Sequence, residues 1–124
     1  MLKYDPELGV DKETWLNADE GVRIDAVVQY HKDINIRVPN IRIHAIVHQV
    51  VESQLAEGIE QVQQKLEELM ADGLSRHNAI HAIATALTGV LFNIIRNEPL
   101  QEDGNQAYFK KLEKVTAESW LNFK

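Results

Sequence analysis

The sequence contains no cysteine among its 124 residues. Disulfide bonds, thiolate metal sites and a cysteine nucleophile are therefore excluded, and the absence fits a reducing compartment. The first residues carry neither a basic start nor an apolar run, so we predict no secretory signal peptide. The longest nearly uncharged stretch, residues 78–96, contains a histidine, two threonines and two asparagines, which favours a buried helix over a membrane span. We expect a cytoplasmic protein with no membrane partner.

Positive charge is also scarce, because 13 Lys and Arg residues stand against 19 Asp and Glu residues, for a formal net charge of −6. Phosphate neutralisation by basic side chains supplies most of the non-specific affinity for nucleic acids. One group of basic residues is interspersed with acidic ones: Arg23, Asp25, Lys32, Asp33, Arg37 and Arg42. We interpret this group as a solvated surface of mixed charge and expect no nucleic-acid partner.

The familiar catalytic motifs are missing as well. The sequence has no HExxH, no GxSxG and no glycine-rich phosphate loop. Ser53 and Ser75 lie near histidines in the sequence, but Ser75 is explained more simply as a helix cap. Glu52 with His48 could exchange a proton, yet nothing positions a substrate beside them. We assign no catalytic residue and favour a protein that is not an enzyme.

What the sequence does contain is helical periodicity. Hydrophobic residues make up 44% and charged residues 26%, an ordinary balance for a globular protein. We predict an all-α fold in which residues 1–124 form a single domain, a compact bundle of about five helices. The stretch 76–97 is apolar on nearly every side, so we expect it to be the long central helix.

Capping residues give the expected helix bounds. The expected N-caps are Asp5 followed by Pro6, Asn17 in a capping box with Glu20, Asn40, and Ser75. A short helix is expected to reach about Leu16, and the main helices are expected at residues 17–32, 40–57, 59–71, 76–97 and 105–123. Residues 33–39 and 98–104 are expected to be loops, the first of them with a short extended segment as the alternative.

Two HxxxH pairs stand out on two of these helices. At about 100° per residue, one face of the first helix gathers His44, His48 and four apolar residues: Ile41, Val47, Val51 and Leu55. Its opposite side gathers Arg42, Gln49, Ser53 and Glu57, and Glu52 falls at the edge of the inner face. On the later helix, His77 and His81 share one side. We therefore expect both pairs to point toward other helices, and the two helices to pack together.

Histidines four residues apart converge, so two pairs on facing helices can present four nitrogens to one ion. We predict a Zn²⁺ or Fe²⁺ site whose ligands are His44, His48, His77 and His81, with Glu52 as a fifth ligand. His31, at the end of the preceding helix, is expected either to join the site or to support a ligand.

The alternative interpretation makes these histidines a hydrogen-bonded polar core. The protein would then be a non-catalytic structural or interaction module that forms a homodimer or binds a protein partner. The amphipathic last helix supports this alternative, because Trp120 and Phe123 could extend onto such a partner.

Part of the pattern resembles hemerythrin-like proteins, which use a His, then HxxxE, HxxxH and HxxxxD on four helices. His48 with Glu52 and His77 with His81 resemble the middle of that order. The likeness ends there, because no histidine follows His81 and an entire helix separates the two elements. This departure argues against a di-iron oxygen carrier.

A second resemblance covers roughly Trp15 to Ile95. It is carried by residues 30–31, 38–40, 44–48, 51–56 and 73–83, which include both HxxxH pairs. These stretches resemble an uncharacterised bacterial family of short helical proteins, a domain of unknown function with no known activity. The resemblance implies a bacterial cytoplasmic protein and no catalytic residue, and the last helix lies outside it.

Overall fold

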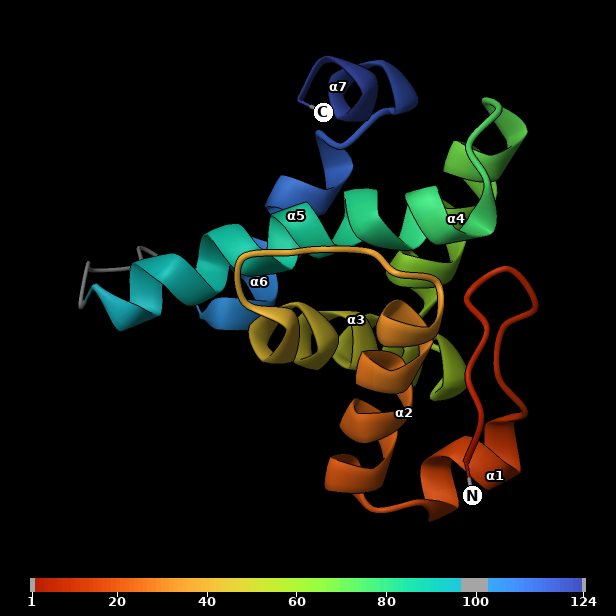
Figure 1. The fold of residues 1–124 in the computed structure, drawn as a ribbon. Coiled ribbons are helices and arrows are strands. Elements are labelled where there is room, and N and C mark those ends of the chain that lie inside the picture. Colours follow the sequence, from red (N-terminus) through yellow and green to blue (C-terminus); the bar gives the residue numbers. More distant parts are fainter. Residues whose placement is uncertain (1, 97–102, 124) are drawn as a thin grey trace. The chain divides into compact units, whose positions relative to one another are not determined.

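The computed structural model describes residues 2–96 and 103–123, and within these ranges the regular elements are helices (Figure 1). Their bounds are α1 Lys12–Asn17, α2 Glu20–Asp33, α3 Ile41–Ala56, α4 Glu60–Ala71, α5 Arg76–Ile95, α6 Gly104–Glu113 and α7 Ala117–Phe123. The predicted all-α class is confirmed. The helices form two compact units, residues 1–59 and residues 60–124, which are described in turn. The prediction of a single domain stays a prediction.

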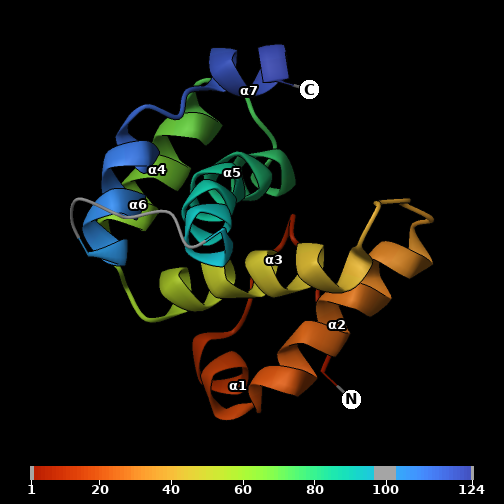
Figure 2. The ribbon, with the colours of Figure 1, turned by 90° about the vertical axis from the view of Figure 1, so that its left-hand side faces the viewer.

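In the first unit, α3 contacts both α1 and α2 (Figure 2). The buried core of this unit combines aromatic and small aliphatic side chains: Tyr4, Trp15, Ile24, Ala26, Val27, Ala45 and Ala56. The alanines let neighbouring helices approach closely, and the two aromatic rings fill much of the remaining volume. The central position of α3 therefore places side chains from several of its faces inside the protein.

Two polar residues of α3, Gln49 and Ser53, are buried, although the helical angles place them opposite the inner face. The Trp15 indole N–H donates to Ser53 Oγ at 3.0 Å, and the Ser53 hydroxyl donates to Gln49 Oε1 at 2.6 Å. The Arg23 guanidinium donates to Ser53 Oγ at 3.2 Å and to Gln49 Oε1 at 3.3 Å. Their mutual hydrogen bonds remove the cost that otherwise keeps such side chains at the surface.

The short helix predicted from Pro6 begins only at Lys12. Asp5 forms a turn instead: its Oδ1 accepts from the Glu7 N–H at 2.9 Å and its carbonyl from the Gly9 N–H at 3.1 Å. Gly9 has a φ of 82°, which ends the turn. The cap is Asp11, whose carboxylate accepts from the Thr14 N–H at 3.0 Å. This path leaves Tyr4 in an irregular segment that is buried nonetheless.

The predicted capping box of Asn17 and Glu20 is also wrong. Asn17 ends α1, and Asp19 is the N-cap of α2. Since the two helices follow each other directly, a residue already helical in the first cannot adopt the extended conformation of a cap for the second. At its other end α2 stops before Asn35, which has a φ of 62°. The predicted loop that follows is confirmed.

The caps predicted at Asn40 and Ser75 are confirmed. Asn40 Oδ1 accepts from the Ile43 N–H, and Ser75 Oγ accepts from the Asn78 N–H, both at 3.1 Å. The predicted end of α3, at about residue 57, is confirmed too. Gly58 has a φ of 78°, and the next residue's N–H reaches back to the carbonyl of Gln54 at 3.0 Å.

In the second unit, α5 contacts α4, α6 and α7 (Figure 2). The buried residues around it are mostly aliphatic: Val62, Leu69, Leu74, Ala79, Ile80, Ala82, Ile83, Ala86, Val90, Ala107, Tyr108, Leu112 and Val115. The predicted end of the central helix at Asn97 and most of the predicted loop 98–104 lie outside the described residues. Within its described part, α5 is the helix on which the others of this unit pack.

The predicted last helix, 105–123, is instead two helices. Thr116 and Ser119 form a reciprocal cap, in which the Thr116 N–H donates to Ser119 Oγ at 2.9 Å and the Ser119 N–H donates to Thr116 Oγ1 at 3.0 Å. The buried Lys65 ammonium holds the break by donating to the Val115 carbonyl at 2.9 Å. Between α6 and α7, the Thr116–Ser119 cap and the bond from Lys65 to the Val115 carbonyl thus take the place of continuous helical hydrogen bonds.

No helix within the described ranges combines the length and the apolar character of a membrane-spanning segment.

Replacing Ser53 by alanine tests the buried polar network of the first unit. The substitution leaves the Trp15 indole N–H without its acceptor, so we expect the free energy of unfolding to fall by about 1–3 kcal/mol. Urea denaturation followed by circular dichroism measures the change. Gln29→Ala is the control, because its exposed bond to Asp33 lies outside the network. Equal stability of the two variants would contradict the expectation.

Candidate metal centre

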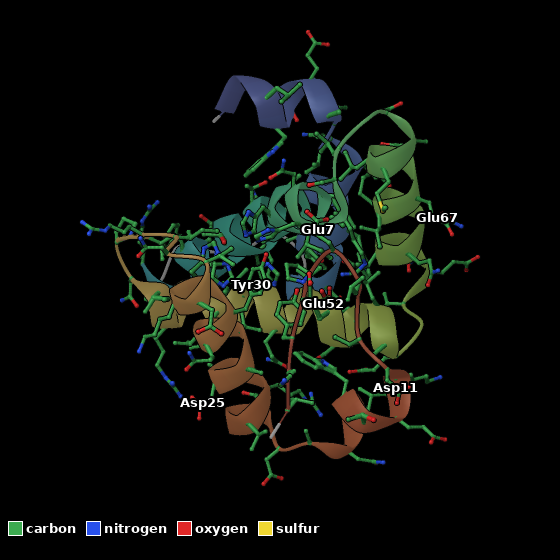
Figure 3. The ribbon with its side chains drawn as sticks, turned by 45° about the vertical axis from the view of Figure 1, so that its right-hand side comes forward. Glu7, Asp11, Asp25, Tyr30, Glu52 and Glu67 are labelled. Atoms are coloured by element: carbon green, nitrogen blue, oxygen red, sulfur yellow. The ribbon has the colours of Figure 1, made fainter. Side chains whose placement is uncertain are left out.

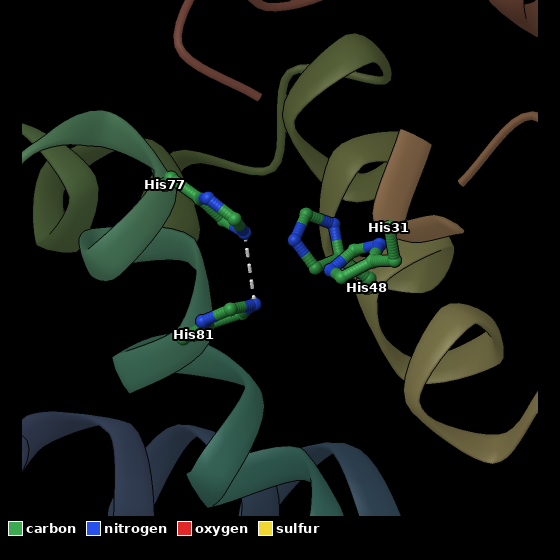
Figure 4. Close-up of side chains that lie close together, drawn as sticks. All are labelled: His31, His48, His77 and His81. Carbon is green, nitrogen blue, oxygen red and sulfur yellow. Dashed lines mark hydrogen bonds between the residues drawn. The ribbon is translucent and has the colours of Figure 1, made fainter. Parts of the chain in front are cut away.

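Three histidines gather in the first unit. His31 lies in the last turn of α2, while His44 and His48 lie one turn apart on α3. His31 and His48 are 0% and 1% exposed, and their rings lie beside each other with centroids 5.4 Å apart (Figure 4). His31 Nε2 is 3.2 Å from His44 Nε2, and a ring nitrogen of His31 lies within 4.8 Å of one of His48. His31 is therefore the residue that both α3 histidines approach.

Local backbone structure fixes the position of His31. The Ile36 N–H donates to the His31 carbonyl at 3.0 Å, a bond of the kind that ends helices when the next residue is left-handed, as Asn35 is. In the side chain, His31 Nδ1 lies 2.8 Å from the Val27 carbonyl oxygen. Because a carbonyl can only accept, Nδ1 carries the proton, and Nε2 of the neutral ring has the lone pair that a metal needs.

Burial lowers the pKa of His31, and the hydrogen bond to the Val27 carbonyl opposes that shift. Desolvation is the larger of the two causes, so the imidazole is held in its neutral form. Neutral imidazole is also the form that coordinates a metal ion. The environment of His31 thus favours the protonation state required of a ligand.

His48 belongs to a chain of hydrogen bonds that starts at a buried carboxylate. The Tyr4 hydroxyl donates to Glu52 Oε2 at 2.5 Å and lies 3.0 Å from His48 Nδ1. Glu52 is 0% exposed. Its side chain comes from α3, and that of Tyr30 comes from α2 (Figure 3). The Tyr4 ring packs on Trp15, with centroids 5.6 Å apart, and edge-on against Tyr30 at 6.0 Å.

The second unit carries the other pair, on the first turns of α5. His77 Nε2 and His81 Nε2 are 3.1 Å apart, and the ring centroids are 4.2 Å apart (Figure 4). The Ser75 cap begins α5 so that both residues fall on one side of it, one turn apart. His77 is 9% exposed, and the Trp120 ring lies 6.1 Å from that of His81.

The predicted site residues are thus placed as follows. Each HxxxH pair lies on one side of its helix as predicted, and His31 joins the pair on α3. His48 is more deeply buried than His44, although the helical angles placed His44 at the centre of the inner face. Glu52 was expected at the edge of that face and is fully buried. Sequence reasoning missed Tyr4, because a single tyrosine in an irregular segment carries no periodic signal.

The nitrogen separations match the geometry of a metal site. Zinc binds imidazole nitrogen at about 2.0–2.1 Å with tetrahedral angles, which separates two ligand nitrogens by roughly 3.3 Å. The His31–His44 and His77–His81 separations of 3.2 and 3.1 Å are close to that value. Each unit therefore holds one pair of nitrogens spaced like two ligands of a single ion, a spacing that a hydrogen bond between imidazoles also gives.

Comparison with protein-family models, with curated proteins and with solved structures finds no match for this chain. The resemblance to a bacterial family of helical proteins accordingly stays a prediction.

The pKa of His31, measured in metal-free protein, tests the environment of this side chain. We expect its imidazole to titrate below 6.5, the ordinary value, because burial disfavours the charged form. As pH falls through that value, the unfolded chain takes up a proton that the folded chain does not, so the free energy of unfolding decreases. NMR titration of the His31 ring in folded and urea-unfolded protein measures both pKa values. A folded-state pKa at or above 6.5 would contradict the expectation.

Proposed function

We propose that this protein binds a transition-metal ion, Zn²⁺ or Fe²⁺, through its histidines. The observation that carries the proposal is the His31–His44 contact. Two buried or half-buried imidazoles face each other through Nε2 at 3.2 Å, and the Val27 carbonyl fixes the proton of one of them on Nδ1. A ring nitrogen held neutral, with its lone pair directed at a second imidazole, is prepared for a shared ion.

The chemistry of the donor set supports the same metals. Imidazole is a ligand of intermediate softness that suits Zn²⁺ and Fe²⁺, whereas Mg²⁺ and Ca²⁺ prefer oxygen ligands. Neutral histidines leave the charge of the ion uncompensated, and the first unit supplies a buried carboxylate at Glu52. This carboxylate is joined to His48 through Tyr4, so negative charge lies next to a proposed ligand.

The proposed ligands are the four histidines of the two HxxxH pairs, His44, His48, His77 and His81. His31 joins them because its Nε2 lies 3.2 Å from that of His44. Glu52, buried beside His48, is proposed as a source of negative charge.

Elemental analysis of untagged protein tests the proposal. We expect at least about one zinc or iron ion per chain, either as purified or after removal of metal and reloading with Zn²⁺. Both His44→Ala/His48→Ala and His77→Ala/His81→Ala should bind less metal than the wild type, because each removes two of the proposed ligands. We also expect a chelator to lower the melting temperature of the wild type, since metal binding stabilises the folded state.

Gln63→Ala/Glu67→Ala on α4 is the matched control, a double substitution four residues apart at exposed positions. It should keep the metal. A wild type that takes up no metal, and melts identically with and without chelator, would overturn the proposal. The alternative of a structural or interaction module with a polar histidine core would then stand.

A further inference from the structure

A buried tyrosine connects a carboxylate to one of the proposed ligands. His48 and Glu52 lie one turn apart on α3, and the hydroxyl of Tyr4 lies between their polar atoms. All three residues are buried: Tyr4 is 7% exposed, His48 is 1% exposed and Glu52 is 0% exposed. A phenol that contacts both groups in a buried environment has its hydrogen-bonding roles set by them, because water does not compete there.

The positions of the protons follow from the donors and acceptors. The Tyr4 hydroxyl has one proton, which it donates to Glu52 Oε2. Its oxygen can therefore only accept from His48 Nδ1, 3.0 Å away, so the proton of the neutral imidazole lies on Nδ1. The Nε2 atom of His48 then carries the lone pair. The same tautomer is fixed in His31 by the Val27 carbonyl.

We infer that Tyr4 is a positioning residue of the metal centre, which fixes the tautomer of His48 and connects this ligand to the charge of Glu52. The inference rests on the proposed metal binding. Metal-bound histidines generally donate their other ring N–H to a carboxylate or carbonyl, which orients the ring and increases its basicity as a ligand. Here the carboxylate acts through a phenol, and Glu52 supports a ligand instead of coordinating the ion itself.

The Tyr4→Phe variant separates this role from packing. Phenylalanine keeps the ring contacts with Trp15, Tyr30 and His48 and removes only the hydroxyl. We expect the Nδ1–H form of His48 to lose its dominance in the metal-free variant. Long-range ¹⁵N–¹H NMR at about pH 8, where imidazoles of ordinary pKa are neutral, reads the tautomer directly. We expect Zn²⁺ affinity, measured by competition with a chromophoric chelator, to fall about 10- to 100-fold.

Two further variants make the result specific. Tyr30→Phe is the matched control, because it removes a hydroxyl from the same aromatic cluster. Burial and the charges of Asp5 and Glu7 raise the pKa of Tyr30. The Tyr30→Phe variant should keep both the His48 tautomer and the Zn²⁺ affinity. Glu52→Gln keeps an oxygen that can accept from Tyr4 and removes the charge. We expect it to retain the Nδ1–H form while binding Zn²⁺ more weakly, and it serves as the second test if Tyr4→Phe does not fold.

The outcomes distinguish this inference from the proposed function. Wild-type Zn²⁺ affinity in both Tyr4→Phe and Glu52→Gln, or an unchanged His48 tautomer in Tyr4→Phe, would overturn the inference and leave metal binding by the wild type intact. A wild type that does not bind Zn²⁺ would overturn the proposed function, and the inference with it. Loss of the Nδ1–H form together with weaker Zn²⁺ binding, in Tyr4→Phe and not in Tyr30→Phe, is the result expected of a positioning residue.

Discussion

The hydroxyl of Tyr4 makes the interaction on which the first unit most depends. It connects an irregular segment near the N-terminus to α3 across 44 and 48 positions of sequence, at His48 and Glu52. A buried carboxylate without a partner is costly, so the burial of Glu52 requires a donor such as this phenol. The ring of Tyr4 also belongs to the core of the unit, beside Trp15. Core packing and the candidate metal centre therefore share one residue.

The features of the fold that were predicted correctly depend on contacts between residues less than about one helical turn apart. Asn40 and Ser75 cap their helices because a side-chain oxygen next to a helix start needs only a backbone N–H three residues away. Asn17 fails as a cap because the preceding helix already includes it. The burial of Gln49 and Ser53 depends on Trp15 and Arg23, which are distant in sequence. Periodicity describes the polarity of a helix face but not which partner will cover it.

The same division applies to the candidate site. Residues four apart on a helix lie on one side of it, so both HxxxH pairs follow from their spacing. His31 depends on where α2 ends, and that end requires the left-handed residue Asn35 in the loop beyond it. His31 also lies in the last turn of α2, where the partial negative charge of the backbone carbonyls favours a nearby cation. Tyr4 depends on the path of the chain before α1, which no repeat in the sequence encodes.

The two tryptophans of the chain are divided between the units. Trp15 lies against Tyr4, the residue that contacts His48, and Trp120 lies beside His81. Indole emission responds to polarity, to charge and to quenching groups within a few ångströms. Each histidine group therefore has its own intrinsic fluorophore, and a protein that retains only one of the two indoles reports optically on one group and not on the other.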